Sequence, residues 1–111
     1  MQFPAAGTFM VDPELEELRR EFLAEANDKV REMERSAARL SPESLANLTH
    51  LAHQLKGSGG SYGFQVISDE ATEVEAAIED GGSAETIVQH VMKLRNEIDR
   101  LSAGTLSGGG G

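Results

Sequence analysis

The sequence predicts an all-α fold: an antiparallel up-down four-helix bundle with a disordered glycine-rich C-terminal tail. Four separate stretches carry apolar residues at three- and four-residue steps, the period of an amphipathic helix. Aromatic residues make up only 5% of the chain, which favours an aliphatic helical core over a β-sandwich. The connections between the stretches are short, as in antiparallel bundles.

The first predicted helix begins at Asp12-Pro13, an N-cap residue followed by proline at the first helical position. Its apolar stripe consists of Leu15, Leu18, Phe22, Ala26, Val30, Met33, Ala37 and Leu40. Residues 1–11 precede this start signal, and we expect them to form a flexible leader.

The second predicted helix begins at Ser41-Pro42-Glu43, which repeats the same start signal. Its stripe consists of Leu45, Leu48, Leu51, Ala52 and Leu55. Glycine costs about 1 kcal/mol relative to alanine inside a helix. We therefore expect this helix to end in the glycines at 57, 59 and 60, and residues 59–63 to form a turn.

The third and fourth predicted helices follow the same period. The third has Ile67, Ala71, Val74 and Ile78 and is closed by Gly81-Gly82. The fourth follows the N-cap residue Ser83 and has Ile87, Val91, Leu94, Ile98 and Leu101. The bundle is therefore predicted to span residues 12–101, and residues 102–111 to be a disordered tail or linker.

The composition of the chain excludes several classes of function. A chain of 111 residues forms one domain, and its net charge of −9 argues against nucleic acid as a partner. There is no cysteine, so thiol chemistry and disulfides are excluded. No stretch approaches the roughly 20 apolar residues of a membrane span. We expect a cytoplasmic, monomeric domain that does not bind membranes.

Two histidines of the second helix are predicted to point outward. Around the helix axis, with Leu45 at 0° and about 100° per residue, the apolar stripe centres near 300°. His53 then falls at about 80° and His50 at about 140°. An exposed imidazole is largely neutral at pH 7, so one ring nitrogen is free to attack an electrophile.

The residues around His53 favour a reactive site over an inert surface histidine. Lys56 at i+3 lies within reach of an anion attached to the ring, and Gly57 at i+4 leaves space beside it. Between Thr49 and Val66, Lys56 is the only Lys, Arg, Asp or Glu. Such a charge-poor patch suits the docking of a partner protein.

Residues 50–64, HLAHQLKGSGGSYGF, resemble the signature of histidine phosphotransfer domains, and the first helix (REFLAEANDKVREME) is also similar to that family. The matching positions are His53, Lys56, Gly57, Ser58, Gly59 and Gly63, within a similarity that spans roughly residues 13–101. The resemblance implies that His53 accepts a phosphoryl group, which Lys56 stabilises. We expect Gly57, Ser58, Gly59, Gly63, His50 and Gln54 to serve partner access and docking.

The resemblance implies a phosphoryl carrier without catalytic activity of its own. Its expected partners are a response-regulator receiver domain, a hybrid histidine kinase, or both. Phosphoryl transfer depends mainly on positioning and charge neutralisation. The chain is therefore expected to bind no cofactor or metal, with Mg²⁺ held by the receiver.

Three alternatives remain open. A carboxylate-bridged metal bundle needs inward Glu-x-x-His pairs, but Asn47, His50 and Ile87 precede the three histidines by three residues. The chain is also compatible with a receiver-docking bundle that is not phosphorylated, or with the phosphoacceptor module of a larger chemotaxis-type kinase.

For several other residues we expect a structural role and no part in the chemistry. We expect His90 to pack at the edge of the fourth helix, and Tyr62 and Phe64 to close one end of the bundle. The acidic residues Glu73, Glu75 and Glu79 are interpreted as ordinary solvated surface.

Overall fold

The computed structural model describes residues 13–110, with side chains up to residue 104. This part contains four helices, α2 (Pro13–Ala37), α3 (Pro42–Ser61), α4 (Gln65–Glu79) and α5 (Ala84–Gly110), and no strand. The predicted all-helical fold is thus confirmed for these residues. The leader and the N-cap at Asp12 lie outside them.

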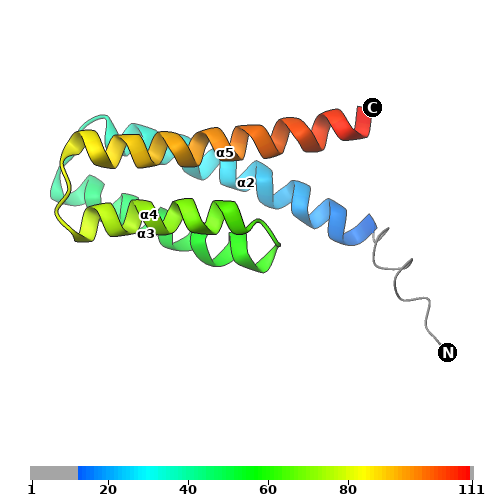
Figure 1. Cartoon of the computed structure of the whole chain (residues 1–111), viewed down its shortest axis with the longest axis horizontal. Coiled ribbons are helices and arrows are strands. Elements are labelled where there is room, and N and C mark those ends of the chain that lie inside the picture. Colours follow the sequence, from blue (N-terminus) through cyan, green and yellow to red (C-terminus); the bar gives the residue numbers. More distant parts are fainter. Residues whose placement is uncertain (1–12, 111) are drawn as a thin grey trace.

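Each helix packs against two of the others. α3 contacts α2 and α4, and α5 contacts the same two helices, so α3 and α5 lie on a diagonal. In Figure 1 successive helices run in opposite directions along the long axis. This arrangement leaves the outer faces of α3 and α4 side by side.

The core is built from aliphatic side chains of all four helices, together with the two buried phenylalanines Phe22 and Phe64. The largest side chains that are fully buried are Met33, Leu48, Leu55, Ile67, Leu94, Ile98, Val30, Val74 and Val91. Most of the predicted stripes therefore face the core.

The first predicted stripe is wrong at its N-terminal end. Leu15 and Leu18 are 42% and 46% exposed. In Figure 1 the first turns of α2 extend past the connection between α3 and α4. Because neither of these helices reaches that far, the helical period continues where there is no opposing core.

A capping box begins α3. The Ser44 amide donates to Ser41 Oγ over 3.1 Å, and the Ser41 amide donates to Ser44 Oγ over 2.7 Å. These two bonds satisfy amides that have no partner within the helix. The predicted start signal at Ser41-Pro42 is thereby confirmed.

The predicted end of this helix is wrong. α3 continues through the glycines to Ser61, and the turn is confined to the residues that follow. Gly63 has φ +84°, a conformation that favours glycine. Burial of Gly59 against α4 provides tertiary packing in this last part of α3, and such packing supplies most helical stability in proteins.

Aromatic residues close this end of the bundle, as predicted. The ring of Phe22 stacks on Tyr62 and Phe64, with centroid distances of 5.3 Å and 5.6 Å. Arg19 donates from Nε to the Tyr62 carbonyl over 3.1 Å, and its guanidinium lies 4.6 Å from the centre of the Phe64 ring. Residues of α2 thus bind the turn between α3 and α4 through ring stacking and one hydrogen bond.

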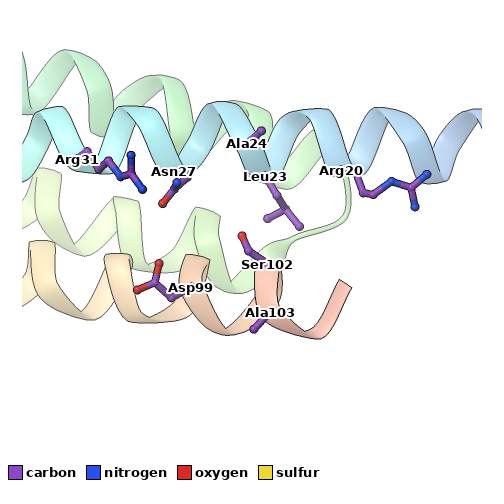
Figure 2. A pocket seen from close by; sticks show the side chains of 8 residues that line it. All are labelled: Arg20, Leu23, Ala24, Asn27, Arg31, Asp99, Ser102 and Ala103. Carbon is purple, nitrogen blue, oxygen red and sulfur yellow. The ribbon is translucent and has the colours of Figure 1, made fainter. Parts of the chain in front are cut away.

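The C-terminal prediction is not confirmed. α5 continues as a helix to Gly110 rather than ending near Leu101. Once a helix has formed, each further residue adds one backbone hydrogen bond, and Ser102 and Ala103 still lie beside α2 (Figure 2). Within residues 13–110, no helix is both long and apolar enough to cross a membrane.

Candidate functional site

His53 lies on the outer face of α3, where its side chain is 71% exposed. His50 and Gln54 are exposed on the same helix, while Leu51, Ala52 and Leu55 are buried beneath. The helix therefore places the imidazole opposite the core, as its predicted angle indicates.

One carboxylate from α4 contacts both predicted functional side chains of α3. Glu75 Oε2 lies 3.2 Å from His53 Nδ1, and Glu75 Oε1 accepts a hydrogen bond from Lys56 Nζ over 3.3 Å. The Glu75 side chain is only 14% exposed, against 43% for Lys56. The interpretation of Glu75 as ordinary solvated surface is wrong.

Sequence reasoning missed Glu75 for a physical reason. It lies 22 residues after His53, and the contact exists only because α3 and α4 pack side by side. On its own helix Glu75 follows the buried Val74, at the edge of the apolar stripe. That edge position is the one signal in the sequence, and it is weak because most helices carry charged residues there.

The contact with Glu75 determines which imidazole nitrogen is available. An ionised carboxylate only accepts hydrogen bonds, so a neutral His53 places its proton on Nδ1 and donates it to Glu75. The lone pair then lies on Nε2, which has no partner among the described residues. The arrangement presents a nitrogen nucleophile to solvent.

The small residues of the motif occupy different environments. Gly57 is exposed, and a side chain added there would meet nothing within 4 Å. Ser58 is half-buried and Gly63 is exposed in the turn. Gly59 is buried against α4. Gly59, for which partner access was expected, therefore does not lie on the open face with Gly57.

A groove in the described part of the chain lies elsewhere, between α2 and α5 (Figure 2). Its volume is about 470 Å³, and it contains neither His53 nor another histidine. Asp99 in this groove accepts a hydrogen bond from Arg95. This bond, and secondly the hydrogen bond from Arg95 to Glu34, raises the pKa of Arg95. His53 thus stands on an open helix surface, away from this groove.

The remaining histidine is peripheral to this site. His90 is half-buried on α5, as expected for packing at the helix edge, and its Nδ1 has no hydrogen-bond partner in the described part of the chain. In that same part, no three His, Asp or Glu side chains are grouped so that they could hold a metal ion.

Comparison with known families identifies the fold that carries this site. The family model described as Hpt domain matches residues 17–104, most of the chain, including His53 and Glu75. The chain belongs to the Hpt domain family. Comparisons with curated proteins and with solved structures give no match.

Hpt domains are phosphocarrier modules of two-component phosphorelays rather than catalysts, and they interact with receiver domains and kinases. An exposed nucleophile on a helix fits such a carrier, because the transferred group must pass directly between two protein surfaces.

Proposed function

We propose that this Hpt domain accepts a phosphoryl group on Nε2 of His53 and exchanges it with the aspartate of a response-regulator receiver domain. The observation that carries the proposal is the exposed imidazole whose Nδ1 faces the Glu75 carboxylate. This contact supports a tautomer with the proton on Nδ1, which leaves the Nε2 lone pair free for the transfer.

The proposed step is a displacement at phosphorus. The Nε2 lone pair forms the N–P bond while the bond from phosphorus to the aspartyl oxygen breaks, and the aspartate leaves as a carboxylate. The Nδ1 proton stays between the ring and Glu75, whose charge balances the positive imidazolium. No general base is needed, because the attacking nitrogen carries no proton.

Lys56 is proposed to stabilise the transferred group. Its ammonium lies one turn from His53 and is 43% exposed, so it can leave Glu75 and approach the phosphoryl oxygens. Water screens this attraction, and the receiver is proposed to supply Mg²⁺ and most of the charge neutralisation. The open space beside Gly57 lets the receiver approach the ring.

The test is phosphoryl transfer from a phosphorylated receiver in the presence of Mg²⁺. The wild-type domain is expected to acquire an acid-labile, alkali-stable phosphoryl group, and His53→Gln is expected to abolish it. Because His53 is exposed, circular dichroism should show an unchanged helical fold in the variant. Persistent labelling of His53→Gln would move the acceptor to another group, and His50→Gln would then identify or exclude the neighbouring histidine.

A further inference from the structure

Gly59 is the glycine of α3 that lies closest to α4. A Cβ added there would lie 3.1 Å from the Ser68 backbone nitrogen, 3.2 Å from Ile67 Cγ2 and 3.3 Å from Ile67 Cβ. All three distances are shorter than ordinary van der Waals contact. The missing side chain is therefore what allows the two helices to pack this closely.

The neighbours of Gly59 have little freedom to move aside. Ile67 is 0% exposed in the core. Ser68 approaches with its backbone nitrogen, which donates to the Phe64 carbonyl over 3.2 Å. The Phe64 amide in turn donates to the Gly59 carbonyl over 2.7 Å. A side chain at Gly59 must therefore displace the first turn of α4 as a unit.

Such a displacement reaches the functional site through α4. Glu75 lies about 10 Å along the helix from Ser68, and His53 about 9 Å along α3 from Gly59. The contacts between His53 and Glu75 and between Lys56 and Glu75 are 3.2 Å and 3.3 Å. These lengths are already at the long end for hydrogen bonds. A separation of a few tenths of an ångström weakens both.

We propose that Gly59 is a positioning residue: it sets the distance between α3 and α4 at which Glu75 holds the proton on Nδ1 of His53. The separation of two packed helices depends on the side chains at their contact, and at this contact Gly59 has no side chain. The effect on the imidazole stands on geometry alone. The effect on transfer rests on the proposed function of His53.

Gly60 provides a matched control. It is the next residue of the same helix, is exposed, and an added Cβ would lie 3.9 Å from Ser68 Oγ, an ordinary contact. Both Gly59→Ala and Gly60→Ala raise the helix propensity of α3. Only the first pushes α4 away, so the difference between the two variants isolates the spacing of the helices.

The experiment measures the tautomer of His53 by ¹⁵N NMR of the imidazole, and phosphoryl uptake from a phosphorylated receiver with Mg²⁺. Gly59→Ala is expected to lose the preference for the proton on Nδ1. It should also slow uptake by about threefold to tenfold, the effect of one weakened hydrogen bond. Gly60→Ala should retain the tautomer and the rate.

A double-mutant cycle separates positioning from general structural damage. In a Glu75→Ala background, which has no side-chain acceptor for the Nδ1 proton, Gly59→Ala is expected to cause no further loss of rate, because its effect passes through that acceptor. Equal slowing in both backgrounds would overturn the proposal. So would an unchanged tautomer in Gly59→Ala.

Glu75→Asp keeps the proposal testable if Gly59→Ala does not fold. This substitution withdraws the carboxylate by one methylene without touching the helix contact, and should also weaken the preference for Nδ1. An unchanged tautomer in Glu75→Asp would show that the distance is unimportant and overturn the proposal. A tautomer shift in a protein whose wild type is never phosphorylated would support the positioning role and refute only the phosphoacceptor function.

Discussion

At the scale of single residues, Glu75 matters more for orientation than for stability. Ion pairs between exposed groups contribute only about 0–1 kcal/mol to folding, and Lys56 is 43% exposed. The contact with His53 has a different consequence, because it fixes which ring nitrogen carries the proton. A small interaction energy is enough to select one of two tautomers.

Glu75→Gln is expected to slow phosphoryl uptake by about threefold to tenfold, because a hydrogen bond to a charged group is stronger than a neutral one by about 1 kcal/mol. The amide oxygen can still accept from Nδ1, but it no longer balances the charge of the imidazolium. Rates of labelling with a phosphorylated receiver measure the effect.

Glu73→Gln is the control for this prediction. It removes the same charge from an exposed position on the same helix, and in the described part of the chain Glu73 forms no hydrogen bond or ion pair with His53 or Lys56. Equal slowing in the two variants would indicate a general effect of the acidic surface and would contradict a specific role for Glu75.

At the scale of single residues, the sequence predicted the part of the site that lies within α3. His53, Lys56 and Gly57 share one helix, so a spacing of three and four residues places them together without knowledge of the fold. Glu75 comes from α4, and no periodicity within one helix relates it to His53.

At the scale of elements, α3 shows that composition alone does not decide where a helix ends. Three glycines near its C-terminus are unfavourable in isolation. They are accommodated because Gly59 packs against Ile67 and the backbone of Ser68. The same glycine that predicts a helix end from propensity becomes a contact point once α4 is in place.

The N-terminus of α3 should affect stability without affecting transfer. Ser41→Ala removes the side chain that accepts from the Ser44 amide, and is expected to lower the free energy of unfolding by about 1 kcal/mol. Ser41 lies about 18 Å along α3 from His53, so the rate of phosphoryl uptake should stay unchanged. Urea denaturation and the labelling assay measure the two quantities. Unaltered stability would show that the cap is made by other groups.

At the scale of the whole molecule, stability and function are carried by opposite faces of the same helices. The core joins all four helices, while the proposed acceptor stands on the exterior of α3. Changes at the exposed site therefore cost little folding free energy. Changes in the core act on the entire domain.

A pair of leucines tests where the core ends. Leu48→Ala is expected to cost about 2–5 kcal/mol, because Leu48 is 0% exposed. Leu18→Ala should change stability by less than about 0.5 kcal/mol, because Leu18 is 46% exposed. Thermal or urea unfolding of both variants measures the difference. Similar losses would mean that the first turns of α2 are buried in solution.

The sequence by itself determined the all-helical fold, the number of helices among the described residues, most of the core, and the outward position of His53 with Lys56 beside it. These features follow from local periodicity, which each helix carries within its own residues. Only the tertiary structure decided that Glu75 meets His53, that Gly59 is a contact rather than a helix end, and that Leu18 lies beyond the core. Each of these depends on which residues of another helix stand opposite, and that is set by how the four helices pack together.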